Sequence, residues 1–523
     1  MTFSRPVVTG GYAYTKLETL VVVLAASLLA AFAVEEIPRI LFPWDLRMFS
    51  ESVLLTDMLK MTAGHGPYSP PADENSFIYA PGLEYLTFGL LRPFGAQLDI
   101  RACRAVTVLV GLASALVAGR IVVRFAEALG PLRHARTARF VAGAAAALLV
   151  FKSYTADACH PDNLYCLHAM LVIALCDAAI DRQSYRAAAA AIAVAGLGIA
   201  VKQTAVPGAL GALAVVLWFC GRAFGPTRSA LLAGVSAVCV AAGAWLVFHG
   251  PGKFWALDIP SRQTIEIERL YGLVGHVMSV PHRVLLLLTF VPSVLFLGML
   301  TGQRATTLLG AWLVLGATEV VPSLASYFKV LGWWNNLTIL DLWAALPVLG
   351  VIAHVVHSPR DPHRVLARAV AGGAFATFFV AVMPTRAWPT HRQFELGRGL
   401  DNAVASDIAS GRRVLVSIGA VTLVHAGVLD IPLDRASSIA ERSFAGLDDF
   451  AETRSRLSEH YYGAIYLFGA EAPGYPPDVQ QVIDANYHTT RTLEGDGMSL
   501  LSKDAFGVMG LMSGGVRVLE ANR

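Results

Sequence analysis

Acidic residues stand beside long apolar runs at two places in this sequence. Asp45 follows an apolar run in "PWDLRMF", and Asp157, His160 and Asp162 fall between two such runs in "DACHPDNLY". A carboxylate at a membrane surface is partly desolvated, which raises its pKa toward the range of a general base. Asp45 is therefore a candidate base for a hydroxyl nucleophile, although capping of a surface helix or pairing with Arg47 explains it equally well.

The "DACHPDNLY" turn offers two carboxylates and an imidazole within a short stretch. Such a set could position an acceptor or bind a divalent cation, but zinc and calcium sites normally gather further ligands from elsewhere, so we assign no metal ligand here. Asp162 follows Pro161 and also suits the cap of the next helix, while Asp157 suits the end of the previous one. Capping and a functional role are compatible.

Basic, aromatic and amide residues also occur beside or between the apolar runs. Lys202 interrupts an apolar hairpin in "GIAVKQTAVPG", where a lysine is costly without an anionic partner such as a lipid phosphate. Snorkelling to the headgroups is the alternative. Arg262 has the forked donors that suit phosphate oxygens. Tyr68, Tyr79 and Asn335 could bind a sugar, although aromatic residues at such boundaries are often interfacial anchors.

Long apolar runs must position these residues. The chain has 523 residues, of which 55% are hydrophobic and 15% charged, so a membrane protein is indicated. Its net charge of +3 is too small to suggest a nucleic-acid binder. About 11 runs of roughly 17 to 22 residues could each cross a membrane as a helix. We expect them near residues 17–37, 102–123, 139–156, 163–181, 187–201, 205–220, 230–249, 284–300, 306–322, 338–356 and 367–384.

Arginine-rich loops alternate with the loops that carry the candidate residues. "RFAEALGPLRHARTAR", "DRQSYR", "GRAFGPTR" and "HSPRDPHRVLAR" all fall at one end of the predicted helices, which the positive-inside rule places in the cytoplasm. The opposite ends then carry Asp45, the "DACHPDNLY" turn and Lys202. The sequence therefore predicts a multi-pass integral membrane protein, most simply of the bacterial inner (plasma) membrane, with its polar chemistry outside the cytoplasm.

The composition changes after residue 384. Residues 385–523 carry charges throughout, and "RVLVSI" and "AIYLF" are typical of strands between helical segments. We expect a transmembrane domain at 1–384, with an extracytoplasmic loop at 38–100, followed by a small extracytoplasmic α/β domain at 385–523. No G-x-G-x-x-G follows a strand, so nothing indicates dinucleotide binding.

Together, "WDLRMF", "GHGPYSPP", "FIYAPGLEYL", "DACHPDNLY" and "VKQTAV" resemble motifs of the GT-C superfamily of integral-membrane glycosyltransferases. The resemblance covers residues 17–350 and is to the dolichyl- or polyprenyl-phosphate-sugar-dependent branch, with its protein O-mannosyltransferases and lipid A aminoarabinose transferases. It implies an all-α polytopic fold whose active site opens at the outer membrane surface. Two features depart from these subfamilies: Asp-Leu-Arg replaces the Asp-Glu pair of the mannosyltransferases, and the terminal domain matches neither.

The resemblance also implies roles for individual residues. Asp45 corresponds to the catalytic aspartate of the first loop, and Asp157 or Asp162 to a second acidic residue that orients acceptor or donor. Lys202 corresponds to a contact with the donor phosphate, and Arg262 is a further candidate for that contact.

The predicted reaction is a single inverting displacement. Nucleotide sugars stay in the cytoplasm, so an outward-facing enzyme needs a donor such as a polyprenyl-phosphate sugar. The base would deprotonate a hydroxyl of an envelope glycan, lipid or protein, while Lys or Arg stabilises the phosphate leaving group. No cofactor beyond the lipid donor is required, and the dependence on a divalent cation stays an open question.

Two other classes of function are compatible with a chain of many apolar runs. A polytopic lipid or solute transporter or flippase is the main alternative, but such proteins usually carry charges near the membrane midplane and paired halves. Glu319 is the main charge inside an apolar run, and no repeat is evident. A membrane anchor that displays residues 385–523 would need far fewer helices.

Overall fold

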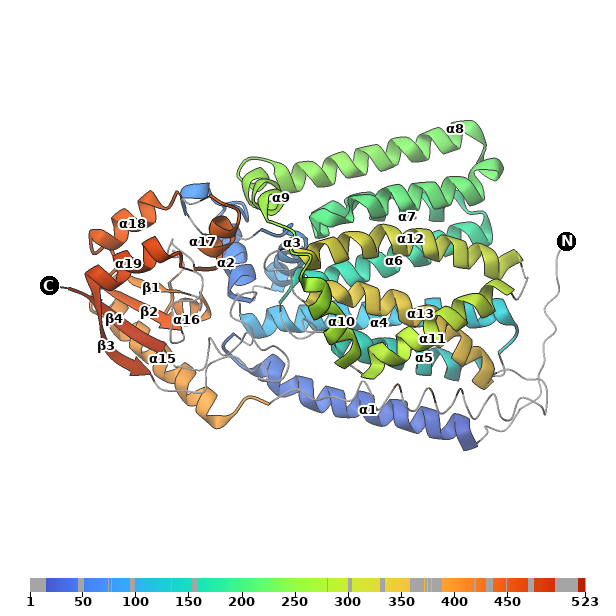
Figure 1. Cartoon of the computed structure of the whole chain (residues 1–523), viewed down its shortest axis with the longest axis horizontal. Coiled ribbons are helices and arrows are strands. Elements are labelled where there is room, and N and C mark those ends of the chain that lie inside the picture. Colours follow the sequence, from blue (N-terminus) through green and yellow to red (C-terminus); the bar gives the residue numbers. More distant parts are fainter. Residues whose placement is uncertain are drawn as a thin grey trace.

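Long apolar helices lie side by side and form the larger part of the molecule, and a small sheet with its own helices lies beyond one end of them (Figure 1). The computed structural model describes residues 16–45, 51–73, 75–76, 78–94, 99–132, 134–152, 159–279, 281–299, 303–329, 334–357, 371, 374, 378, 388–417, 420–428, 436–447, 449–468, 475–493 and 516–522.

The helices of the first part are α1 (Lys16–Leu41), α2 (Glu51–Thr62), α3 (Gly82–Leu91), α4 (Ile100–Leu129), α5 (Ala135–Lys152), α6 (Pro161–Arg182), α7 (Tyr185–Val201), α8 (Val206–Phe248), α9 (Ile259–Arg262), α10 (Arg269–Ser279), α11 (Pro281–Met299), α12 (Gln303–Phe328) and α13 (Thr338–His357). The long helices of the first part follow the predicted apolar runs closely, whereas the shorter helices α2, α3, α9 and α10 lie outside those runs.

Six stretches of the described residues are long and apolar enough to cross a membrane: Glu18–Leu41, Ile100–Leu129, Pro161–Arg182, Gln203–Phe248, Thr307–Phe328 and Thr338–His357. The prediction of an all-α polytopic membrane protein is confirmed. The predicted total of about 11 spans is not, and most of the predicted run 367–384 lies outside the described residues.

α8 consists of two legs joined by a reversal. Gly225 adopts φ 76° and ψ 172°, a conformation that glycine reaches without a steric penalty. A straight helix of 43 residues would be about 65 Å long. Instead, Gly243 near its end lies against Ile199, which precedes its start. The two legs match the separate predicted runs 205–220 and 230–249.

The C-terminal part contains a four-stranded sheet in the order β1-β2-β4-β3, in which β1 is parallel to β2 and the other pairs are antiparallel. Its strands are β1 (Val414–Val416), β2 (Ala464–Phe468), β3 (Tyr487–Leu493) and β4 (Val516–Ala521), and its helices are α15 (His391–Ala409), α16 (Ala420–His425), α17 (Ala436–Phe444), α18 (Ala451–Ser458) and α19 (Pro477–Asn486). The predicted C-terminal α/β fold is confirmed, with β1 and β2 where the sequence placed strands. The domain boundary and the side of the membrane stay predictions.

The C-terminal part shares a hydrophobic core with the segment that follows α1. Phe42 and Trp44 belong to the same buried cluster as residues of α15 and the sheet. The rings of Phe42 and Phe394 lie 5.1 Å apart, and Trp44 Nε1 donates to Asp401 Oδ2 at 3.0 Å. The segment that carries Asp45 is therefore held between the long helices and the C-terminal part.

Candidate functional site

A buried ion pair joins two of the predicted site residues. Lys202 Nζ lies 2.5 Å from Asp162 Oδ1, and both side chains are almost fully buried. The same ammonium group donates to Asn336 Oδ1 at 2.8 Å and lies 5.3 Å from the centre of the Tyr165 ring. A buried charge pair is tolerated only when its remaining hydrogen-bonding capacity is met, which Asn336 does in part.

Helix ends place these residues. Lys202 is the C-cap of α7 and has extended backbone angles, so the chain leaves α7 there. Asp162 lies in the first turn of α6, directly after Pro161. The N-cap residue of α6 is His160 and not Asp162, contrary to the sequence-based alternative, because the His160 side chain accepts from the backbone N–H of Asp162. His160 Nδ1 also lies 3.2 Å from Asp162 Oδ2, which is an ion pair only when that nitrogen carries a proton.

The segment 66–80 brings a predicted sugar-binding tyrosine to this pair. The rings of Tyr79 and His160 lie 5.4 Å apart in an edge-on arrangement. Gln203, the neighbour of Lys202, fixes the segment: its Nε2 donates to the carbonyl of Ile78 at 2.8 Å, and its Oε1 accepts from the N–H of Ala80. Tyr79 is thus positioned by the same turn that carries Lys202.

Tyr68 has a different role. Its hydroxyl donates to the carbonyl of Tyr79 at 2.5 Å, so it supports the backbone of the segment. Burial, with nearby carboxylates, raises the pKa of both tyrosines well above its ordinary value. Both phenols are therefore neutral hydrogen-bond donors over the physiological pH range.

Asp45 is buried at the end of the turn that follows α1, and Ser52 Oγ donates to its Oδ1 at 2.6 Å. This bond fixes the carboxylate of the predicted base against the first turn of α2. Arg47, the alternative partner weighed from the sequence, lies outside the described residues.

A buried arginine holds the turn that carries Asp45. Arg104, on α4, pairs with Glu51 at 2.7 Å and donates to the backbone carbonyls of Arg39, Phe42 and Trp44. Sequence analysis did not single out Arg104 or Glu51. The available signal was a charged residue inside the predicted run 102–123, which is costly unless it is paired.

Glu51 also connects the two acidic turns. Its Oε1 accepts from the backbone N–H of Cys159 at 3.4 Å, and Cys159 directly precedes His160. The turn with Asp45 and the turn with His160 and Asp162 are thus attached to one carboxylate.

Further polar residues lie between the helices next to Lys202. Tyr165, whose ring faces Lys202 Nζ, donates its hydroxyl to Glu319 Oε2. Glu319, on α12, is buried and lies against Gly208 of α8. Glu319 was the main charge inside an apolar run, and so the main sequence feature in favour of a transporter. In the structure it is the hydrogen-bond partner of Tyr165, beside the Lys202–Asp162 ion pair.

The remaining predicted site residues lie apart from the residues around the Lys202–Asp162 pair, or they lie outside the described residues. Arg262 is exposed at the end of α9, so it is not part of the buried group around Lys202. Asp157 lies outside the described residues, as does the side chain of Asn335. The amide beside Lys202 is that of the neighbouring Asn336.

No protein-family model matches the chain, and no curated protein matches it. Similar solved structures include the apo Archaeoglobus fulgidus oligosaccharyltransferase, at 11% identity and a TM-score of 0.49, covering 96% of this chain and 88% of that one. Oligosaccharyltransferase AglB from the same organism, with an inhibitory peptide and a dolichol-phosphate, has 10% identity, a TM-score of 0.47 and coverage of 95% and 88%. ArnT from Cupriavidus metallidurans, bound to undecaprenyl phosphate, has 12% identity, a TM-score of 0.49 and coverage of 97% and 98%. At identities of 10 to 12% and TM-scores below 0.5, these matches assign no family, residue, substrate or activity to this chain.

Proposed function

We propose that this protein is a membrane glycosyltransferase that moves a sugar from a polyprenyl-phosphate-linked donor to a hydroxyl acceptor. The observation that supports the proposal is the buried Lys202–Asp162 ion pair, together with the attachment of its turn and of the turn that carries Asp45 to the same Glu51–Arg104 pair. Glu51 connects the two acidic turns, and Lys202 supplies a cation beside Asp162.

Asp45 is the general base in this mechanism. Ser52 holds one carboxylate oxygen, so the carboxylate is oriented before an acceptor arrives. As the acceptor oxygen attacks the anomeric carbon, its proton passes to Asp45, and the bond between that carbon and the phosphate oxygen breaks. The sugar therefore changes its anomeric configuration in a single displacement.

Lys202 stabilises the leaving phosphate. An ammonium group has three N–H donors, and Asp162 and Asn336 accept two in the structure. A donor phosphate either accepts from the third or replaces Asp162. Asp162 then orients Lys202 between turnovers and keeps it charged while buried.

Tyr79 and His160 lie beside this pair and are the sugar-binding candidates. Their edge-on rings offer an apolar face together with polar groups that can bind hydroxyls. Glycan, lipid and protein hydroxyls are all compatible acceptors, and we favour an acceptor of the bacterial envelope.

The test is transfer of radiolabelled sugar from a panel of polyprenyl-phosphate sugars by purified protein in liposomes, with envelope extracts as acceptors. Asp45→Asn should abolish transfer, whereas Asp484→Asn, an exposed carboxylate on α19, should leave it unchanged. Full activity of a folded Asp45→Asn protein would refute the assignment of the base. Movement of labelled lipid across the bilayer without transfer would favour a flippase.

A further inference from the structure

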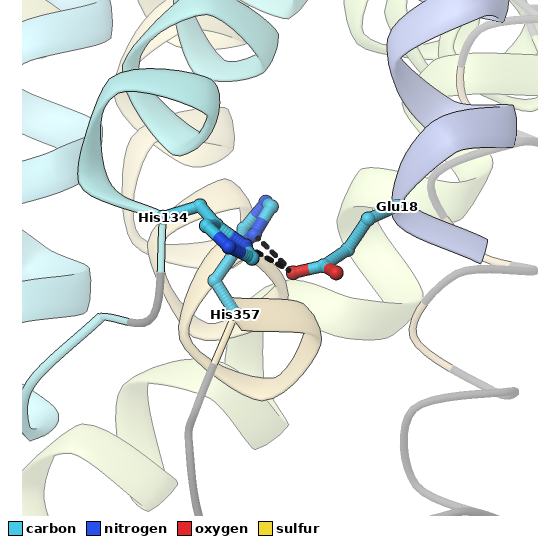
Figure 2. Close-up of side chains that lie close together, drawn as sticks. All are labelled: Glu18, His134 and His357. Atoms are coloured by element: carbon cyan, nitrogen blue, oxygen red, sulfur yellow. Dashed lines mark hydrogen bonds and ion pairs between the residues drawn. The ribbon is translucent and has the colours of Figure 1, made fainter. Parts of the chain in front are cut away.

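Glu18, His134 and His357 converge at the other end of α1 from Asp45 (Figure 2). Glu18 lies in the first turn of α1, His134 in the turn before α5, and His357 is the last residue of α13. Figure 2 shows both imidazole rings directed at one oxygen of Glu18, and each Nδ1 lies 3.2 Å from that Oε1. Three elements distant in sequence thus contribute one ligating group each.

We propose that Glu18, His134 and His357 form a binding site for a divalent metal ion of the zinc class. Imidazole nitrogen and carboxylate oxygen are ligands that Zn²⁺ and its neighbours in the first transition row prefer. The three ligating atoms all lie within 4.8 Å of one another. Bonds of about 2.0 to 2.1 Å in a tetrahedral site place ligand atoms roughly 3.3 Å apart. Both nitrogen-to-oxygen separations of 3.2 Å already match that edge.

Burial supports an enclosed site. Glu18 and His357 are 1% and 2% exposed, while His134 is 15% exposed. The partly exposed His134 is the side of the site that solvent reaches. Three protein ligands leave a fourth position for water.

A hydrogen-bonded cluster is the competing interpretation, because a buried carboxylate needs partners even without a metal. The convergence of both rings on the same oxygen favours a shared centre, since two donors could otherwise spread over both carboxylate oxygens. Elsewhere among the described residues, the buried Glu51 is compensated by an arginine, which cannot bind a metal.

Occupancy would fix the position of α1. The ion would tie the first turn of α1 to α13 and to the turn before α5, whereas α1 otherwise presents exposed apolar side chains such as Leu20 and Val23. The far end of α1 leads to Asp45, so the site would set where that helix stands along the bundle. This role is structural and does not depend on the proposed sugar transfer.

The experiment uses the purified full-length protein, stripped with a chelator and then loaded with Zn²⁺ or Co²⁺. We expect about one tightly bound ion per chain by elemental analysis and calorimetry, with the visible bands of four-coordinate Co²⁺. The Glu18→Gln and His357→Gln variants should lose both the tightly bound ion and the Co²⁺ bands. His425→Gln is the matched control, because His425 forms a simple histidine-carboxylate pair with Asp401 at 2.8 Å, and it should bind normally.

Circular dichroism and gel filtration establish that each variant is folded. If His357→Gln does not fold, His134→Gln replaces it, since His134 lies in a turn and is partly exposed. Metal content that is the same in wild-type protein and in folded Glu18→Gln would overturn the proposal, as would wild-type protein without the Co²⁺ bands. Because binding is measured directly, failure here is distinguishable from failure of the transferase assignment.

Discussion

Each end of the long helices contains a buried carboxylate, but the partners of that carboxylate differ between the two ends. At one end, Asp162 faces the amino group of Lys202. At the other, Glu18 faces the imidazoles of His134 and His357. A lysine has donors only, which suits the anionic donor phosphate proposed for its end, whereas neutral imidazoles have lone pairs, which suit the metal ion proposed for the other end.

Their surroundings differ as well. The Asp162 end adjoins residues 78–80 and lies near the C-terminal part, which shares a core with Phe42 and Trp44. The Glu18 end adjoins a groove with several charged residues. α1 connects the two ends, with Glu18 in its first turn and Asp45 just beyond its last, so a change at one end can reach the other through a single helix.

Removal of the Lys202 amino group should have the largest effect. Lys202→Met leaves Asp162 buried without its counter-charge, so we expect complete loss of sugar transfer and destabilisation by about 3 to 5 kcal/mol. Thermal unfolding in detergent and the transfer assay measure the two effects. Adding Asp162→Leu should restore stability without activity, and a double variant that transfers sugar would contradict the role of Lys202. By comparison, Glu18→Gln should cost less stability, since it leaves no unpaired charge.

The next effect concerns the turn that carries Asp45. Arg104→Met removes the partner of Glu51 and the donors to three backbone carbonyls, so Asp45 should shift. We expect kcat to fall about 100-fold through misplacement of the base. Arg101→Met is the control on the same helix, since its pair with Asp99 is exposed. Equal kcat in both variants would show that Arg104 does not position Asp45.

The attachment of the C-terminal part should depend on pH. Burial raises the pKa of Glu441 to about 8 from its ordinary 4.5, despite the hydrogen bond from Gln263 and the charge of Lys329. Since the folded state favours the protonated acid, this stabilisation is complete below pH 4.5 and is lost as pH rises to about 8. The melting temperature should fall over that interval, and Glu441→Gln should reduce the slope.

Glu84 contributes in the same direction, because burial and the nearby Asp57 raise its pKa to about 8. Glu84→Gln should therefore remove a further part of the slope, and the double variant with Glu441→Gln should be the flattest. A slope unchanged in all three variants would assign the pH dependence to other groups.

Metal removal should have the smallest effect on activity and sharpens the comparison of the two ends. A chelator should lower the melting temperature of the wild-type protein by a few degrees, because bound metal stabilises only the folded state. Glu18→Gln should show no such response, while Asp162→Asn should show the full response. A loss of metal response in Asp162→Asn would contradict the separation of the two ends.

Local patterns predicted a large share of this fold. Apolar runs such as 102–123 and 338–356 are helices, and "AIYLF" is a strand, because hydropathy and residue period act over neighbouring residues. The sequence alone also singled out Asp45, Asp162 and Lys202, since a charge beside an apolar run is costly wherever the chain goes.

Only the tertiary structure decided the partners of those charges. Asp162 and Lys202 are 40 positions apart, Lys202 and Asn336 are 134 apart, and Glu18 and His357 are 339 apart. The docking of the C-terminal part on the Asp45 segment was likewise not readable from local patterns. The physical reason is that hydropathy determines which segments are buried, whereas the packing of helices against one another determines which buried charges meet.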